Sequence, residues 1–242
     1  MTIDSPLVLV AGAASRDVTA NDPRGWRLGG GVTYGSLTLG RLGLRVRAAI
    51  GVDDLATGAM ELDHLRAAGV EVHLVRLRSG PVFENLESVA GRRQHCLATS
   101  DVVAFDGLPA HWTNDLDAVL LAPVAGELDA GWASARAPVV ALGWQGLLRE
   151  LRAGRDVVRR APSPSPLLDA ASLIGASRDD FALGTSVASL ARLLGPSKTL
   201  VLTEGEAGGR IVHTSSDGRP RAARRYPAIP SDLRHARRRC RP

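Results

Sequence analysis

The sequence predicts an α/β domain with a mostly parallel central sheet. Four short runs of apolar residues are typical of strands that a parallel sheet buries on both faces. They are residues 7–11, 117–121, 138–142 and 199–203. After the first of these runs, segments with helical spacing of apolar residues alternate with strand-like ones. This alternation is expected where each crossover between parallel strands contains a helix.

The first strand, residues 7–11, is followed within a few positions by Asp17. Ligands of α/β sheets bind at the carboxyl ends of the strands, and a carboxylate there can accept hydrogen bonds from two adjacent hydroxyls. Asp17 is therefore a candidate for binding a polyhydroxylated ligand. The alternative is that it is an ordinary loop or cap carboxylate.

Three consecutive glycines, including Gly30 and Gly31, precede a predicted helix over residues 32–43. Glycine permits positive φ and leaves no Cβ between a ligand and the main chain. A strand over residues 46–50 follows, and then Asp53 or Asp54 is expected to cap the next helix. The apolar residues of that helix are expected to be Leu55, Met60, Leu62 and Leu65, up to Gly69.

Residues 18–26 and 83–96 are polar and strand-like, and the second stretch is typical of a hairpin with its turn at Ala90 and Gly91. Taken alone, such strands would form a solvated surface. Later in the chain, Glu127 and Gln145 follow two predicted buried strands and are candidates to face a ligand cleft. Glu127 fits the start of a helix equally well.

The ordered set of motifs resembles the ribokinase-like (PfkB) family of small-molecule kinases. It comprises the glycine loop, a helix, the RLGLRV strand, the GVDDLATG turn, a second helix and AAGV. The resemblance covers residues 7 to about 233. It implies a three-layer α/β/α domain over residues 1–233 and a small β lid made by strands at about 18–27 and 82–98. It also implies phosphoryl transfer from ATP, with Mg²⁺, to a hydroxyl of a sugar, polyol or nucleoside.

The resemblance also implies where ligands bind. The candidate substrate-binding residues are Asp17, Gly30, Gly31, Tyr34, Asn85 and Glu127; the candidate nucleotide-binding residues are Asp180, Thr203, Gly205 and Gly208. Asp180 is also the candidate for organising Mg²⁺-bound water, in a segment where Ser177 replaces the family's asparagine and a helix cap is the other explanation. Likewise, a hairpin between residues 199–203 and 210–214 would explain Gly205 and Gly208 without a ligand. Tyr34 replaces another family asparagine, so the identity of the sugar does not carry over.

The family's D-T-x-G-A-G-D block does not follow residue 233. In the family this block supplies the catalytic aspartate and an anion hole at a helix N-terminus. Residues 234–242 form an arginine-rich tail instead. We therefore expect a truncated or frameshifted member with impaired catalysis and no catalytic residue of its own. The alternative is a non-catalytic sugar- or nucleotide-binding protein.

The net charge of +5 does not indicate a nucleic-acid-binding domain. Nine arginines and one aspartate after Gly218 give that segment +8, which leaves about −3 for the rest of the chain.

No apolar run is long enough to span a membrane and no secretory signal is evident, so a cytoplasmic protein is expected. Cys96 and Cys240 are expected to be free thiols. The resemblance also allows a homodimer through the lid.

Overall fold

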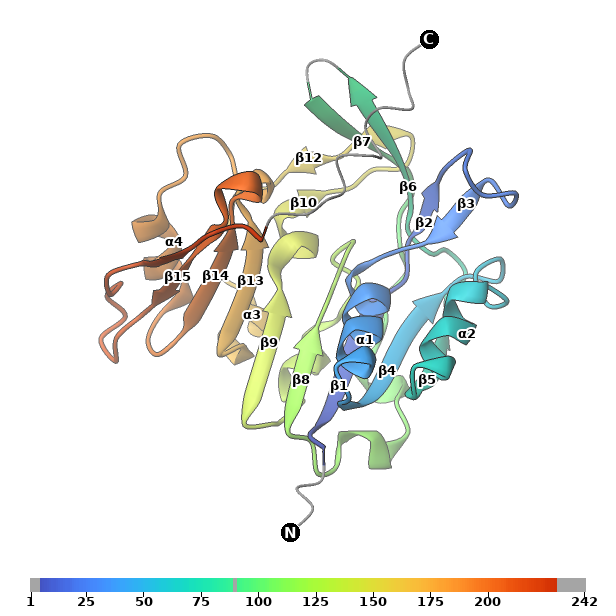
Figure 1. The fold of residues 1–242 in the computed structure, drawn as a ribbon, viewed down its shortest axis with the longest axis horizontal. Helices are drawn as coiled ribbons and strands as arrows, with labels where there is room; N and C mark the ends of the chain where they lie inside the picture. Colours follow the sequence, from blue (N-terminus) through green and yellow to red (C-terminus); the bar gives the residue numbers. More distant parts are fainter. Residues whose placement is uncertain (1–4, 89–90, 230–242) are drawn as a thin grey trace.

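The computed structural model describes residues 5–88 and 91–229. Within this part, the centre is a nine-stranded sheet in the order β16-β15-β14-β13-β9-β8-β1-β4-β5 (Figure 1). The parallel strands are β1 (Leu7–Ala13), β4 (Arg45–Val52), β5 (Val70–Arg76), β8 (Ala118–Leu121), β9 (Val139–Gly143), β13 (Leu173–Ser177) and β14 (Thr199–Thr203). Two strands, β15 (Gly209–His213) and β16 (Arg224–Tyr226), run antiparallel at one edge. The four predicted apolar runs are all strands of this sheet.

Helices cover both faces of the sheet, because its strands carry apolar side chains on each side. Helices α1 (Gly31–Arg41) and α2 (Met60–Ala67) pack with Val10 and Ile50 on one face. Helices α3 (Pro166–Ala170) and α4 (Val187–Leu194) pack with Leu9 on the other. Single 3₁₀ turns complete the layers: Phe105–Gly107, Ala110–Thr113, Ala130–Ser134, Trp144–Leu148, Arg178–Asp180 and Gly205–Ala207. The three-layer α/β/α architecture is confirmed.

The start of α2 differs from the prediction. Asp53 Oδ1 accepts a hydrogen bond from Ala56 N at 3.1 Å and so closes a turn, whereas the N-cap of α2 is Ala59, which makes no side-chain cap. The other oxygen of Asp53 accepts two bonds from Arg16, at 2.8 and 3.0 Å. The expected cap of α2 is therefore wrong: Asp53 caps the turn that precedes the helix, and its second oxygen pairs with Arg16 of the lid. Leu55, expected on the buried face, is 67% exposed.

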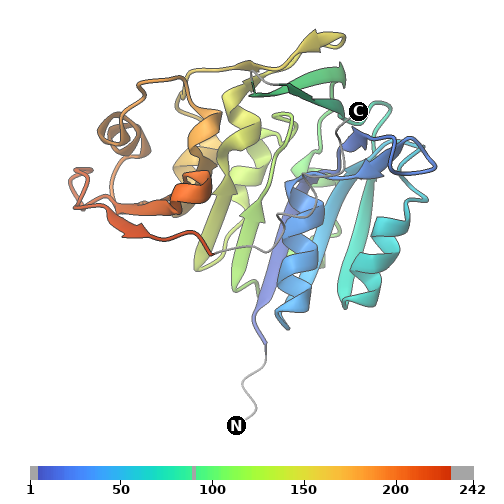
Figure 2. The ribbon, with the colours of Figure 1, turned by 45° about the horizontal axis from the view of Figure 1, so that its top comes forward.

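A second sheet lies across the carboxyl ends of the parallel strands, along the top of Figure 2. It forms the lid, in the order β11-β7-β6-β2-β3. Its strands are β2 (Arg16–Val18), β3 (Trp26–Leu28), β6 (Val82–Ser88), β7 (Gly91–Ala98) and β11 (Arg155–Asp156). Beside it, β10 (Arg149–Glu150) pairs with β12 (Val158–Arg159).

The lid strands differ in part from the prediction. The sequence predicts one strand-like stretch at about 18–27, but the chain forms two short strands, β2 and β3, on either side of a loop. A further strand, β11, pairs with β7 in the lid, and no pattern in the sequence predicts it. Ala90, predicted in the β6–β7 turn, lies outside the described residues, as does the arginine-rich tail at 234–242.

Two further expectations concern cysteine and the membrane. Cys96 is a buried free thiol, and burial raises its pKa; Cys240 is outside the described residues. The helices that the structure describes all fall short of the length and apolar character that crossing a bilayer requires.

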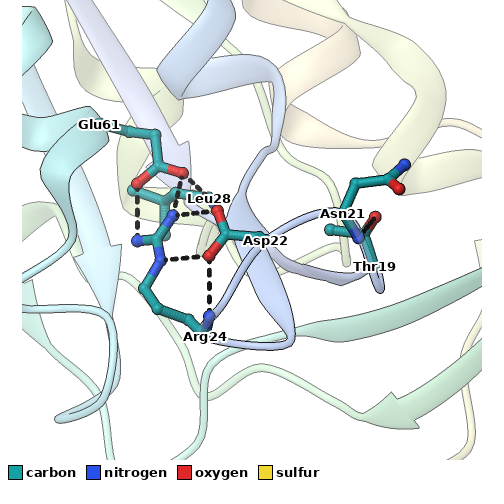
Figure 3. A network of polar contacts seen from close by, with 6 residues as sticks. All are labelled: Thr19, Asn21, Asp22, Arg24, Leu28 and Glu61. Carbon is teal, nitrogen blue, oxygen red and sulfur yellow. Dashed lines mark hydrogen bonds and ion pairs between the residues drawn. The ribbon is translucent and has the colours of Figure 1, made fainter.

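An ion-pair network attaches the β2–β3 loop to α2 (Figure 3). Arg24 Nη2 lies 2.8 Å from Asp22 Oδ2 and 2.8 Å from Glu61 Oε1, and Glu61 also accepts a bond from Leu28 N at 3.0 Å. Hydrogen bonds from Arg24 lower the pKa of Asp22 to about 2. Burial alone would raise the pKa of Glu61, but its bonds with Arg24 and Leu28 N lower it overall.

The network is expected to make stability depend on acid pH. Folding lowers the pKa values of Asp22 and Glu61 below their ordinary values of 3.8 and 4.5. The network therefore stabilises the folded protein fully when the pH is above these ordinary values, and this stabilisation is lost as the pH falls toward about 2. Melting temperatures from pH 5 to pH 2 should therefore fall less steeply in Arg24→Gln than in the unchanged protein. Arg66→Gln, which removes an exposed pair with Asp63, is the control and should keep the original slope. Parallel curves for Arg24→Gln and the unchanged protein would contradict the assignment.

Candidate functional site

A cavity of about 450 Å³ lies between the lid and the carboxyl ends of the central strands. It brings together five of the predicted site residues: Asp17, Gly30, Gly31, Tyr34 and Asp180. They come from the lid strand β2, the start of α1 and the turn after β13. Because these elements are far apart in the sequence, only the fold makes them neighbours. The position agrees with the ligand edge expected for a parallel sheet.

Asp17 faces this cavity because of its place in the lid sheet. In the parallel pairing of β2 with β6, Asp17 is opposite Phe83, so the two side chains lie on the same face of the lid. Both residues line the cavity, whereas neighbouring Val18 is on the other face and is exposed. Ser15 Oγ donates a hydrogen bond to Asp17 Oδ1 at 2.9 Å, which orients the carboxylate.

The glycine loop is required first of all by packing within the protein. A Cβ on Gly29 would collide with Asp17 Oδ2. Gly30 has φ of 90°, and a Cβ there would lie 2.8 Å from Ala13 O. These glycines let α1 begin directly against the end of β1, and Gly30 and Gly31 line the cavity. The N-terminus of α1, with its partial positive charge, therefore opens on this space.

Tyr34 lies in the first turn of α1, and its side chain is half-exposed at the cavity wall. A phenol can donate and accept hydrogen bonds, and its ring is a flat apolar surface. Tyr34 therefore offers a ligand both kinds of contact.

Asp180 lines the same cavity in a fixed orientation and follows β13, three strands away from β1 in the central sheet. Its Oδ2 accepts a bond from Ser177 N at 2.9 Å, and its Oδ1 accepts one from Gln145 Nε2 at 3.1 Å. Ser177 Oγ in turn accepts a bond from Asp179 N, which completes a capping box. The cap anticipated from the sequence is therefore present, and it leaves the Asp180 carboxylate on the cavity wall beside Asp179.

The carboxylates of Asp179 and Asp180 fit a magnesium ion that is bound jointly with a phosphate ligand. Mg²⁺ prefers oxygen donors and commonly takes one or two protein carboxylates, with waters and phosphate oxygens completing its shell. In the described part of the chain, no three acidic, histidine or cysteine side chains are placed to hold a metal ion by themselves. A metal here would therefore depend on oxygens from its ligand.

Thr203, Gly205 and Gly208 lie in the hairpin between β14 and β15, outside this cavity. Gly205 and Gly208 both have positive φ, at 58° and 84°, so the turn itself requires them. A smaller cavity of about 250 Å³ adjoins the hairpin at Glu204 and Arg210 and is also lined by Arg178. Contact of the three predicted residues with a nucleotide stays a prediction.

Glu127 and Asn85 do not line the cavity. The Glu127 side chain is buried and accepts backbone hydrogen bonds from Ala13 N at 2.7 Å, Ala125 N at 2.7 Å and Val124 N at 3.1 Å. Burial raises the pKa of the Glu127 carboxyl. The backbone donors act in the opposite direction, because they favour the charged form, but burial has the larger effect. Asn85 Oδ1 accepts a bond from Gln94 Nε2 at 3.0 Å, and Gln94 does line the cavity. This geometry favours supporting roles for both.

Two charged residues of the cavity wall, Asp179 and Arg149, were not among the predicted site residues. Arg149, at the start of β10, lines the cavity, and its Cζ lies 6.0 Å from the centre of the Phe83 ring. The residues around it, GLLRE, form no motif, so nothing in the local sequence separates Arg149 from the many other arginines of the chain.

No family model and no curated protein matches the sequence. Solved structures do match. A pyrophosphate-dependent kinase in the ribokinase family, complexed with a pyrophosphate analog and myo-inositol, is 17% identical with a TM-score of 0.66, covering 95% of this chain and 82% of that one. Ribokinase from Thermotoga maritima is 12% identical with a TM-score of 0.60, covering 94% and 79%.

A third similar structure is a nucleoside kinase from Burkholderia thailandensis in complex with inosine. It is 12% identical with a TM-score of 0.56, and the match covers 93% of this chain and 77% of that one. At such low sequence identities, the similarity to these structures shows the fold alone. This chain therefore has the ribokinase-like (PfkB) fold.

Proposed function

We propose that this protein binds a sugar, polyol or nucleoside and that its chemistry is phosphoryl transfer from ATP, with Mg²⁺, to a hydroxyl of that ligand. The observation that carries the proposal is the single cavity that joins Asp17 at one end to Asp179 and Asp180 at the other. One end suits hydroxyl groups and the other suits a metal–phosphate group. The similar solved structures, which are kinases, support this reading.

At the acceptor end, Asp17 accepts hydrogen bonds from two neighbouring hydroxyls, while Ser15 keeps its carboxylate in position. The amide of Gln94, positioned by Asn85, provides a further polar contact. Tyr34 offers a phenol and a flat ring on the remaining side. None of these groups is selective for one sugar, so the choice of acceptor depends on the shape of the cavity.

At the donor end, Asp180 and Asp179 would hold Mg²⁺, and the hairpin residues Thr203, Gly205 and Gly208 would line the nucleotide. Mg²⁺ bound there would supply positive charge to the phosphates. The acceptor oxygen would bond to the terminal phosphorus, the bond from that phosphorus to the bridging oxygen of ADP would break, and the hydroxyl proton would pass to solvent water, since no residue of this chain is assigned as the base. The 242 residues contain no Gly-Ala-Gly-Asp sequence. We therefore propose slow transfer by this chain alone, with binding retained.

A calorimetric titration separates the two ends. Ribose, fructose, myo-inositol, adenosine and inosine are the acceptor probes, and ATP and pyrophosphate, each with and without Mg²⁺, are the donor probes. At least one acceptor and one donor should bind, and Mg²⁺ should strengthen donor binding. If no acceptor and no donor binds, the proposed function is wrong. Binding without any phosphorylated product by mass spectrometry would favour a non-catalytic binding protein.

Asp180→Asn is expected to reduce the Mg²⁺-dependent gain in ATP affinity by about tenfold or more, because a metal ligand loses its charge. Asparagine can still accept the bond from Ser177 N, so the cap should survive. Asp63→Asn, which neutralises an exposed carboxylate on α2, is the matched control and should keep the full gain. An undiminished gain in Asp180→Asn would remove Asp180 from the metal site.

A further inference from the structure

Part of the central sheet has no helix over it on the side where α1 and α2 lie. In Figure 1 these two helices lie in front of the part formed by β1, β4 and β5, whereas no α-helix of the described residues lies in front of β9, β13 and β14. Parallel sheets are normally covered on both faces, because their strands carry apolar side chains on each side. The bare part of this face is therefore unusual for a parallel sheet.

The strand register shows which side chains the bare part carries. Val10 packs with α1, and the residues paired with Val10 strand by strand across the sheet lie on the same face as that helix. Because side chains alternate along a strand, every second residue of β9, β13, β14 and β15 shares this face. We call this surface the open face, and its apolar residues are Val139, Ala141, Leu173, Val201 and Ile211.

The open face is not part of the hydrophobic core. Val139 is 42% exposed, and the other four apolar residues are partly exposed. None of the five belongs to a core cluster of the described residues. By contrast, Leu142, Ile174 and Leu200, which lie on the opposite face of the same strands, pack in the core with α3 and α4.

Two glycines on this side of the sheet show the same contrast. Gly12 of β1 lies under α1, and a Cβ on Gly12 would lie 3.3 Å from Val32 Cβ. Gly175 of β13 is on the same side, but the nearest atom to a Cβ there would be Leu142 O, a backbone atom of the neighbouring strand, at 4.0 Å. The space over Gly175 is therefore open.

The open face has room for two helices. It spans four strands, which at about 4.8 Å per strand amounts to about 19 Å, and packed helices lie about 8–10 Å apart. Helix α1 borders it on one side, since a Cβ on Gly35 would lie 3.0 Å from Leu120 of β8. Tyr226 of β16 borders it on the other, with its ring against Gly209.

The border at β16 is positively charged. Arg224 pairs in register with Ile211, so it lies on the same side of the sheet as the open face, and it is exposed. A helix that packs beside Arg224 is therefore favoured if it carries acidic side chains there. Residues 230–242 do not have this chemistry, because they contain five arginines and one aspartate.

A second copy of this chain does not offer a suitable helix either. Helix α1 contains no acidic residue, and α2 and α4 bury their apolar sides, including Leu62 and Leu190, against their own sheet. The charge and the width of the open face therefore favour a different partner.

We propose that the open face is a docking surface for a helical hairpin of another polypeptide, with large apolar side chains toward the sheet and acidic side chains toward Arg224. Large side chains are favoured because Ala141 and Gly175 leave space above the strands. None of the five apolar residues of the open face lines the cavity between the lid and the sheet. This inference is therefore independent of the proposed function.

Synthetic helical hairpins are the probes. In the matched hairpin, two helices of about 15 residues each, long enough to be stable when paired, carry leucine on one side and glutamate along one border. One control has the same composition in scrambled order, and the other has lysine in place of glutamate. Fluorescence anisotropy with the full 242-residue chain should show that the matched hairpin binds about tenfold or more tightly than either control.

Variants locate the binding. Val201→Lys, at the centre of the open face, should weaken binding of the matched hairpin about tenfold or more. Leu183→Lys, which changes a fully exposed leucine outside the open face, is the control and should leave binding unchanged. Arg224→Glu should reverse the charge preference, so that the lysine hairpin binds more tightly than the glutamate hairpin. Because Arg224 is exposed, this reversal can be measured even if Val201→Lys folds poorly.

Three results would overturn the inference. The first is equal binding of the matched and scrambled hairpins, and the second is full binding in Val201→Lys or an unchanged charge preference in Arg224→Glu. The third is a dimer of the unchanged chain in sedimentation velocity that Val201→Lys dissociates, because it would assign the open face to a second copy. Sugar and ATP titrations test the proposed function separately, so either proposal can fail while the other stands.

Discussion

Replacing Asp17 with asparagine is expected to weaken binding of the polyol acceptor by about 1.5 to 3 kcal/mol, or about ten- to a hundredfold. The carboxylate can accept bonds from two hydroxyls, whereas an amide offers one oxygen and places donors where the second hydroxyl must donate. The change is nearly isosteric, which matters because Gly29 leaves the side chain little room. Ser15 Oγ can accept a bond as well as donate one, so the local fold should tolerate the amide.

Calorimetric titration with the acceptor that binds best measures this effect. Asp106→Asn, in an exposed 3₁₀ turn away from the cavity, is the matched control and should bind as tightly as the unchanged protein. Ser15→Ala should have a smaller effect than Asp17→Asn, because it loosens the carboxylate without removing it. Equal affinity in Asp17→Asn and the unchanged protein would exclude Asp17 from the binding site.

The second large effect concerns stability. Glu127→Leu is expected to lower the free energy of unfolding by about 3 kcal/mol or more, because it leaves the buried N–H groups of Ala13, Val124 and Ala125 without their acceptor. These three bonds join the end of β1 to the loop after β8. Glu127→Gln should cost less, since one oxygen remains, but its amide would face a backbone donor.

Urea unfolding at pH 7 measures the difference in free energy. Glu71→Gln is the control: its carboxylate is 56% exposed in an ion pair with Arg47, and its loss should cost about 1 kcal/mol or less. A Glu127→Leu variant as stable as Glu71→Gln would show that the buried carboxylate does not hold these backbone groups.

The central sheet could be predicted because its strands carry their own signal. Residues 7–11 are a continuous apolar run and residues 199–203 hold three apolar residues between two threonines, and short runs of this kind with turn signals beside them favour buried strands. The candidate residues Asp17, Gly30 and Asp180, which line the cavity, could be predicted for a related reason. Each follows a predictable strand or begins a predictable helix, so the fold alone brings them to one edge.

Other features depend on contacts between distant residues and leave no local pattern. Asp53 closes a turn before α2 with one oxygen and binds Arg16, 37 positions earlier, with the other. Glu127 follows a strand end as a ligand-binding residue would, and only the burial of its side chain separates the two roles. Arg149 reaches the cavity from the two-residue strand β10, which is too short to show periodicity.

The pairing of β2 with β6 restricts how this part of the chain can change in length. Asp17 faces the cavity because successive side chains of a strand alternate between faces, and only Ala14 and Ser15 separate β1 from β2. Inserting or deleting one residue in this connection so that the register of β2 against β6 shifts by one position would turn the Asp17 carboxylate to the outer surface and bring Arg16 or Val18 to face the cavity. A register shift of two residues would preserve the orientation of the Asp17 side chain. Functional variants of this connection are therefore expected to differ in length by an even number of residues.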